Sequence, residues 1–413
     1  MTLRRVTIVC CAVTLISTAC RSEPDAKRAA LTAEAFARAE WSQVLDQARG
    51  STVSFAMWAG DGARNSFFQG TVARAVATEL GVTLRMIPVV EPADVVNKLL
   101  NEQRAGRVDQ GTIDLVWING ENFRTARQAG VLWGPFAERL PNIRYYDPSD
   151  RRADFGTPTE GYEAPWEYAQ FVFAYDAARM AAPPSRLPDL KAWIQAHPGR
   201  FTYPAIPDFT GSAFIRHVLL HASGAPRAAF DAGFDEALYA RASAAAIDWL
   251  REVRPSLWRQ GETYPATPAD LNRLFVNGEI DFSMDYNPAF ASDRIARGEF
   301  PATVRTMVLD EGTLTNYSFL AIPFNAANRA GAVAVTNYLL SPAHAFSRMR
   351  EMGGVFPLML EPLSPAERQT LASLAAGPAT LPLEVLTQHR IREADVQYLL
   401  RFERDWRREI LER

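Results

Sequence analysis

The sequence contains very little cysteine: three residues in 413, all within the first twenty positions (Cys10, Cys11 and Cys20). The chain after Cys20 therefore has no thiol for a disulfide, a metal–thiolate site or a nucleophilic cysteine. Its stability must come from hydrophobic burial, and 48% of its residues are hydrophobic. A chain of this length exceeds what one core usually serves, which predicts two lobes.

The chain also lacks long apolar runs and an excess of basic over acidic residues. No apolar stretch after the first twenty residues reaches the length that spans a membrane as a helix. There are 44 Lys and Arg residues against 47 Asp and Glu, a formal net charge of −3. A mildly acidic chain is a poor partner for nucleic acid or an anionic membrane surface, so no nucleic-acid partner is expected.

The first twenty residues have the layout of an export signal. A basic start precedes an apolar run at 6–16, and Ser-Thr-Ala-Cys follows at 17–20. This ending resembles a bacterial lipobox, in which Cys20 is acylated, although Ser17 stands where a lipobox usually has Leu. We expect a signal peptide at 1–19 and attachment to a membrane through lipid on Cys20, with ordinary secretion as the alternative. Either outcome places the protein in the periplasm or cell envelope.

Strand-like and helix-like segments alternate in the next part of the chain, after a polar, alanine-rich tether at 20–40. The expected elements are a first helix at 31–49, strands at 52–58, 82–89 and 113–118, and helices at 64–80 and 91–106. This order predicts an α/β fold with a parallel sheet, in which ligands bind at the carboxyl ends of the strands. The loops at 59–65 and 119–123 are therefore candidate binding loops.

A second α/β region follows a stretch at 145–165 that is rich in Pro, Gly and Asp. Its expected elements, with those of the C-terminal part, are helices at 212–221, 235–254, 328–340 and 391–411 and strands at 280–284 and 316–322. The sequence contains no internal repeat and no low-complexity tract.

Several ordered stretches resemble the extracellular solute-binding proteins of bacterial ABC importers. LFVNGEIDFSMDYNPAF (274–290) and NYSFLAIPFNAANRAGAVAVTNYLLSP (316–342) are similar to a cleft-facing strand and loop and to a crossing strand of that family. The longer strings DLVWINGENF (114–123) and PGRFTYPAIPDFTGSAF (198–214) resemble its YnjB-type branch. The resemblance covers nearly the whole sequence after the leader.

The resemblance implies a two-lobed, type II periplasmic-binding-protein-like α/β fold. Each lobe would hold a mixed, mostly parallel sheet flanked by helices, and strands near 165–173 and 317–322 would cross between lobes. The expected division is 41–168 with 320–355 for the N-terminal lobe and 169–318 with 356–413 for the C-terminal lobe. Such a protein closes on one small-molecule solute and presents it to an ABC permease and its ATPase, as a monomer without a cofactor.

The candidate binding residues lie in five loops or crossing segments that we expect to converge between the lobes. They are Trp58, Gly60, Asp61 and Asn65, then Trp117, Asn119, Glu121 and Asn122, then Trp166, then Tyr203, Asp208, Thr210 and Ser212, and finally Asp285, Tyr286 and Asn287 with Tyr317. Several also have a purely structural explanation. Asn119, Thr210 or Ser212 could cap a helix, and Trp166 could fill the hinge core.

Aromatic rings and carboxylates in this set favour a cation. A cation over a ring face gains roughly 0.5–2 kcal/mol, and Glu121, Asp208 and Asp285 would add full negative charges. Helix N-termini in the same loops favour an anionic group, but a helix end carries only about half a charge. We expect a cationic or zwitterionic solute, thiamine-like or polyamine-like, with an anion as the second choice.

An exported hydrolase acting on a small molecule or sugar in the same cleft is the main alternative. The sequence has no G-x-S-x-G elbow and no H-E-x-x-H motif. His217 and His221 share a helix face, but no third ligand lies near them in sequence, so no metal site is expected. Tyr145 and Tyr146 resemble the paired tyrosines of iron-binding relatives, yet they lie in the Pro- and Asp-rich stretch, and iron is not expected.

Overall fold

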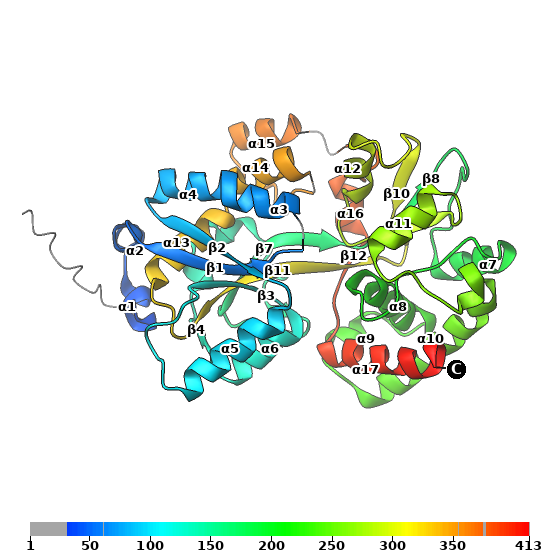
Figure 1. Cartoon of the computed structure of the whole chain (residues 1–413), viewed down its shortest axis with the longest axis horizontal. Coiled ribbons are helices and arrows are strands. Elements are labelled where there is room, and N and C mark those ends of the chain that lie inside the picture. The colour runs from blue at the N-terminus through cyan, green and yellow to red at the C-terminus, as the bar shows by residue number, and fades with distance from the viewer. Residues whose placement is uncertain (1–30, 61, 354, 375–376, 413) are drawn as a thin grey trace, which may run out of the picture.

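The computed structural model describes residues 31–60, 62–353, 355–374 and 377–412. Two lobes lie side by side, and strands run from one lobe into the other (Figure 1). Each lobe has its own hydrophobic core, one built mainly from 31–168 and 317–363 and the other mainly from 171–314 and 379–410. The two-lobed α/β fold expected from the sequence is therefore confirmed.

The first lobe is built around a sheet with parallel central strands. β1 (Thr52–Trp58) lies between β2 (Thr83–Val89) and β3 (Leu115–Ile118) and is parallel to both. The interior positions of β1 are all buried, as is typical of a strand covered on both faces. The carboxyl ends of β1 and β3 therefore meet at one edge, where two of the predicted binding loops begin.

Helices pack on both sides of this sheet (Figure 1). From β1 to β2 the chain runs through α3 (Gly62–Phe67), a π-helical turn (Phe68–Val72) and α4 (Ala73–Leu80). The other elements of this lobe are α1 (Ala33–Arg38), α2 (Trp41–Ala48), α5 (Pro92–Arg104), α6 (Gly120–Gln128), β4 (Leu132–Trp133), 3-10 turns at Ala137–Arg139 and Pro141–Tyr145, β5 (Ala153–Asp154), β6 (Thr157–Pro158), α13 (Arg329–Leu339), α14 (Pro342–Met352) and α15 (Pro365–Ala372).

Three strands lie where the chain crosses between the lobes. β7 (Glu163–Gln170) and β11 (Thr313–Pro323) are antiparallel, and the short β12 (Arg390–Arg392) runs parallel to the start of β11. The sequence predicted a helix across 391–411, but the terminal helix begins only at Val396. The Asp395 carboxylate accepts a hydrogen bond from the Gln397 N–H and caps the helix there.

The second lobe contains a three-stranded sheet that is entirely antiparallel. β8 (Val172–Asp176) lies between β9 (Phe282–Asp285) and β10 (Val304–Met307). The expectation of a mostly parallel sheet in each lobe is wrong here, because apolar patterning does not encode the direction of a strand's neighbour. The surrounding elements are α7 (Leu187–Ala196), α8 (Phe209–Ala222), α9 (Ala228–Asp231), α10 (Glu236–Val253), 3-10 turns at Arg254–Ser256 and Trp258–Gly261, α11 (Pro268–Val276), α12 (Phe290–Ala296), α16 (Leu383–Gln388), α17 (Val396–Trp406) and a π-helical turn (Arg407–Leu411).

Two segments pack differently from the expected division of the chain. Leu31 and Phe36, placed in the tether, are buried in the first lobe, Phe36 at 1% exposure. Phe356, Leu358 and Leu363, expected in the C-terminal lobe, also belong to the core of the first lobe. A local sequence shows that these side chains need burial, but only the tertiary structure shows which core they complete.

Candidate functional site

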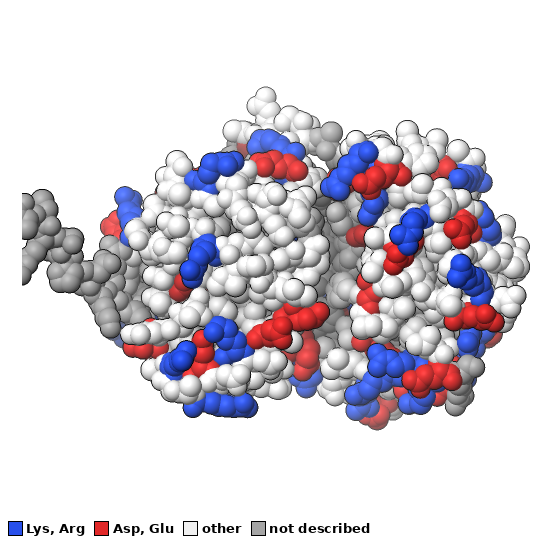
Figure 2. All heavy atoms as spheres, viewed as in Figure 1, with Lys and Arg blue, Asp and Glu red and all other residues white. Residues whose placement is uncertain are grey.

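Cavities open between the lobes, where Figure 2 shows the surface hollowed. One of about 250 Å³, here called the cleft cavity, is lined by residues from 149–156, by Phe230 and Asp231 of the second lobe, and by residues from 392–395 after β12. A cavity of about 770 Å³ lies between 356–361 and 382–388. Tyr317 lines both, whereas the other predicted binding residues lie outside both linings.

Three tryptophans from separate elements form a row in the first lobe. The ring centroids of Trp58 and Trp117 are 6.3 Å apart and those of Trp117 and Trp166 are 5.4 Å apart, with nearly perpendicular planes. Exposure falls along the row, from 39% at Trp58 to 2% at Trp166. Trp166 is therefore part of the core, and Trp58 is the ring that reaches solvent. Gly60 allows this arrangement, because a Cβ at that position would clash with the Trp58 indole.

A buried ion cluster adjoins the tryptophan row. Arg64 Nη1 donates a hydrogen bond to Glu167 of β7, and Arg348 Nε lies 3.2 Å from the other Glu167 oxygen. Burial raises the pKa of Glu167, but the two guanidiniums outweigh burial and the pKa is lowered overall. The Arg64 guanidinium also lies 5.0 Å from the centroid of the Trp117 ring.

The loop after β3 carries three predicted residues at the start of α6. Asn119 occupies the N-cap position, but its side chain makes no capping hydrogen bond. The Gly120 N–H donates instead to the carboxylate of Asp154, which lines the cleft cavity. Helix capping therefore does not explain Asn119. Glu121 is exposed and accepts a hydrogen bond from the Thr125 hydroxyl at 3.2 Å, and Asn122 is half-buried.

The second lobe presents an exposed phenylalanine beside two carboxylates. Asp208 caps α8 by accepting hydrogen bonds from the Thr210 and Gly211 N–H groups at 2.9 and 3.0 Å. Phe209, which the sequence did not single out, is 44% exposed, and its ring centroid lies 5.0 Å from that of Tyr286. Burial raises the pKa of Asp285 to about 6 and also raises that of Asp208.

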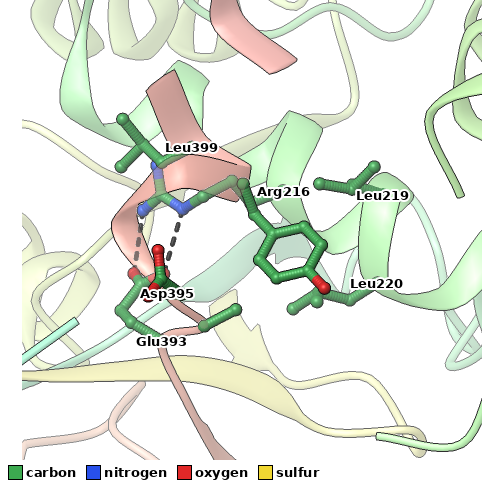
Figure 3. A pocket seen from close by; sticks show the side chains of 8 residues that line it. Arg216, Leu219, Leu220, Glu393, Asp395 and Leu399 are labelled. Atoms are coloured by element: carbon green, nitrogen blue, oxygen red, sulfur yellow. Dashed lines mark hydrogen bonds and ion pairs between the residues drawn. The ribbon is translucent and has the colours of Figure 1, made fainter. Parts of the chain in front are cut away.

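A buried network joins α8 to the segment after β12 (Figure 3), and its Arg216 guanidinium lies 5.4 Å from the centroid of the Phe209 ring. Arg216, 3% exposed, donates to both oxygens of Glu393, from Nε at 3.0 Å and from Nη2 at 2.8 Å. The Tyr286 hydroxyl donates to Glu393 at 2.7 Å, and Arg216 Nη1 donates to the Ser212 hydroxyl. Sequence reasoning missed Arg216, although a lone arginine within an otherwise apolar helical run was a usable signal.

Six predicted residues are buried, and of these only Tyr286 and Tyr317 still border an exposed ring or a cavity. Tyr203 is fully buried in the core of the second lobe, where its hydroxyl accepts a hydrogen bond from Trp406 Nε1 at 3.0 Å. Thr210 and Ser212 of α8 are buried, and Trp166 belongs to the core of the first lobe. Only some residues in the first turn of a helix lie at the protein surface, and the sequence did not show which face of α8 packs against the core.

The remaining predicted residues have the following positions. The side-chain amide of Asn65 donates to the Ala59 carbonyl at 2.9 Å and holds the loop after β1. Asn287 is half-buried, and its side-chain carbonyl oxygen accepts a hydrogen bond from the Ala289 N–H at 3.0 Å. Asp61, like Cys20, lies outside the described residues.

His217, the first of the paired histidines, is committed to the backbone. Its Nε2 accepts a hydrogen bond from the Leu314 N–H at 2.8 Å, and its Nδ1 lies 2.7 Å from the Ala213 carbonyl. Burial lowers the pKa of His217 well below its ordinary value, so the ring is neutral. Among the described residues no group of three or more His, Cys, Asp or Glu side chains is arranged to hold a metal.

Residues 40–375 match the model of the bacterial extracellular solute-binding protein family. The chain belongs to this family. Protein YnjB of Escherichia coli (strain K12) is 36% identical over 337 residues, which cover 81% of this chain and 86% of that protein. The residues that match the family model span α2 to α15, so they include the loops after β1 and β3 and the start of α8 but neither 382–388 nor the segment after β12.

Solved structures of solute-binding proteins share the fold at low sequence identity. The spermidine/putrescine ABC transporter substrate-binding protein PotD from Streptococcus pneumoniae matches with a TM-score of 0.61 and 14% identity, over 87% of this chain and 98% of its own. Iron-bound HitA from Pseudomonas aeruginosa matches with a TM-score of 0.59 and 15% identity, over 86% of this chain and 99% of its own. These similarities establish the fold and leave the solute open.

Members of this solute-binding family are components of ABC transporters and act with a permease and an ATPase rather than as enzymes. The hydrolase alternative is therefore set aside. Because the proteins of this family are extracellular, membership of the family places the chain in the periplasm or cell envelope. None of the helices in the described part of the chain is long and apolar enough to cross a membrane.

Proposed function

We propose that this solute-binding protein captures a cationic or zwitterionic organic solute between its lobes and delivers it to a permease. The observation that carries the proposal is the exposure of Trp58 and Phe209. Of the aromatic side chains in the described residues, these two are the exposed ones, and they lie on different lobes. Large aromatic side chains are usually buried, so a partner that covers both rings would account for their exposure.

The charges near these rings support a solute that carries a positive group. Asp208 and Asp285 flank the Phe209–Tyr286 ring pair, and a cation there would gain roughly 0.5–2 kcal/mol from a ring face. The Glu393 carboxylate accepts a hydrogen bond from the Tyr286 hydroxyl and also lines the cleft cavity, so this ring pair adjoins that cavity.

The separate cores of the lobes support hinge closure. Each lobe has its own hydrophobic cluster, and the connection between them consists of β7, β11 and the segment around β12. We propose that the lobes rotate about these strands when a solute bridges them, and that the closed monomer is the form a permease recognises.

The proposed location at a membrane rests on the leader alone. Signal cleavage before Cys20 and acylation of that cysteine would tether the protein beside its permease. Metabolic labelling with a radiolabelled fatty acid should mark the wild-type protein and leave Cys20→Ala unlabelled. Labelling of both, or of neither, would remove the lipid anchor from the proposal.

The function is tested by thermal shift and calorimetry with putrescine, spermidine, thiamine and glycine betaine as probes. A true solute at about 100 times its Kd should stabilise the protein by about 2.7 kcal/mol and be recovered chemically unchanged. Trp58→Ala and Phe209→Ala should each weaken binding by roughly 2- to 30-fold, the range that one cation–ring contact provides. Val276→Ala on α11, where the side chain is 42% exposed, is the matched control and should bind like the wild type. Equal affinity in all three variants would reject the site.

A further inference from the structure

Asp154 and Glu163 are buried carboxyl groups that the sequence patterns did not indicate. They are 2% and 1% exposed. The Gly120 N–H donates to Asp154 Oδ2, but Asp154 Oδ1 and both oxygens of Glu163 have no hydrogen-bond partner among the described residues. A buried carboxylate without a partner is strongly disfavoured, so each group either carries a proton or awaits a cation.

The charged groups around this pair do not neutralise it. Burial, and then the nearby Glu393, raise the pKa of Asp154 well above its ordinary value. Burial, and then Asp154 itself, raise the pKa of Glu163 in the same way. Arg127 of α6 opposes this shift at Glu163, but its guanidinium lies 3.7 Å from the centroid of the Tyr162 ring and pairs with a surface glutamate. Burial without a hydrogen-bonding partner therefore favours the protonated form of both carboxyl groups in the empty protein.

Asp154 lines the cleft cavity, and it differs from the other carboxylates there. The charged lining residues are Asp150, Asp154, Asp231, Glu393, Asp395, Arg152 and Arg392. Arg390 and Arg392 pair with Asp150 at 2.7 and 3.2 Å, and Arg216 pairs with Glu393. Asp231 pairs with a neighbouring arginine, Asp395 caps α17, and Arg152 is exposed to solvent. Asp154 thus combines a place in the cavity wall with an oxygen that no described protein group satisfies.

The rest of the wall suits an organic cation. Four aromatic rings line the cavity together with these charges: Phe155, Phe230, Tyr317 and Phe319. The volume of about 250 Å³ is large enough for a small amine rather than only for water. Residues from both lobes contribute to this lining, so a solute held there would bridge them.

We propose that Asp154 binds a cationic group of the solute in the cleft cavity and releases a proton to solvent as it does so. This inference rests on the proposed function. When an ammonium group enters, the O–H bond of the Asp154 carboxyl breaks, the proton passes to bulk water, and the carboxylate becomes the counter-ion. Glu163 keeps its own proton and does not compete. The apparent affinity for a cation therefore rises with pH until Asp154 is ionised in the empty protein.

The first test needs no ligand. Asp154→Asn keeps the acceptor for the Gly120 N–H and removes the charge, so its Tm near pH 8 should exceed that of the wild type. The gain should vanish near pH 4, where the wild-type carboxyl is protonated. Asp150→Asn, which removes a buried but paired carboxylate from the same cavity, should instead lower the Tm near pH 8. A lower Tm for Asp154→Asn near pH 8 would show that its charge is already balanced, and would overturn the inference.

The second test measures proton release by isothermal titration calorimetry near pH 7.5 in buffers of different ionisation enthalpy. Putrescine, spermidine and thiamine are the probes. The wild type should release about one proton per bound cation, and Asp154→Asn should bind at least ~10-fold more weakly with no release. Equal binding by both proteins would overturn the role of Asp154 and leave the proposed function intact. Failure of every probe to bind the wild type would reject the cationic solute itself.

Discussion

Replacing Glu393 with glutamine tests the buried network that joins α8 to the last crossing segment. The side chains of Glu393 and Arg216 are 5% and 4% exposed, and the carboxylate accepts two hydrogen bonds from the guanidinium and one from the Tyr286 hydroxyl. Glutamine has nearly the same shape as glutamate, but it has no negative charge, and its amide N–H group would face the N–H and O–H donors of Arg216 and Tyr286. The Arg216 cation is then left buried without its counter-ion.

The expected loss of stability is large. Removing one partner of a buried ion pair costs about 3–5 kcal/mol, because the remaining charge stays desolvated. For a folding unit of 150–250 residues, 1 kcal/mol shifts the Tm by about 2–4 °C. The Glu393→Gln variant should therefore unfold roughly 6–20 °C below the wild type.

Thermal unfolding followed by circular dichroism measures this shift. The control is Glu236→Gln, which removes the carboxylate of the solvent-exposed pair with Arg401, at 72% and 33% exposure. An exposed pair contributes about 0–1 kcal/mol, so the control should shift the Tm by only a few degrees. Removing both charges in Arg216→Met/Glu393→Leu should recover most of the loss. Equal Tm values for Glu393→Gln and Glu236→Gln would refute the reasoning.

Three further changes probe the walls of the site and the core behind them. Gly60→Ala should displace the Trp58 indole and weaken binding of whichever probe the wild type binds, by roughly 2- to 30-fold; titration with unchanged affinity would contradict this role. Asp285 has a pKa raised to about 6 by burial, so the empty wild type should lose stability as pH rises from about 4 to 6. In Asp285→Asn the Tm should no longer fall as the pH rises from about 4 to 6. If the Tm still falls, another group causes this pH dependence. Burial lowers the pKa of His344 to about 4, so the wild type should lose stability as pH falls from about 6.5 to 4, whereas His344→Phe should lose less over that range. An identical acid profile for the two proteins would exclude this histidine as the cause.

Local patterns predicted most of the first lobe correctly. The apolar run at 52–58 is β1, the helical segment expected at 64–80 does end at Leu80 with Gly81 as its C-cap, and the loops after β1 and β3 lie at one edge of the sheet. These features depend on neighbouring residues in the sequence, through side-chain burial and the positive φ that glycine adopts easily. The direction of β9 and β10 relative to β8 has no such local signal, and it was mispredicted.

The candidate site was predicted less completely. Trp58 is exposed and Asp208 and Asp285 are half-buried beside an exposed ring, as expected of binding residues, but Tyr203 lies in the core, although the sequence placed all four in candidate binding loops. Chain position indicates where a loop begins, whereas the packing of a whole helix decides which of its side chains points outward. Asp154 was missed because its significance depends on the absence of a partner, which has no counterpart in the sequence.

The sequence by itself predicts an export leader, and it determined the α/β alternation and the resemblance to solute-binding proteins, because these patterns depend on the order of residues along the chain. Only the tertiary structure decided which rings remain exposed, which core receives 356–363, and which carboxylates find an arginine. Those outcomes depend on groups as distant in sequence as Arg216 and Glu393. Burial and charge compensation act through space, and the fold must bring such groups together before their energies are set.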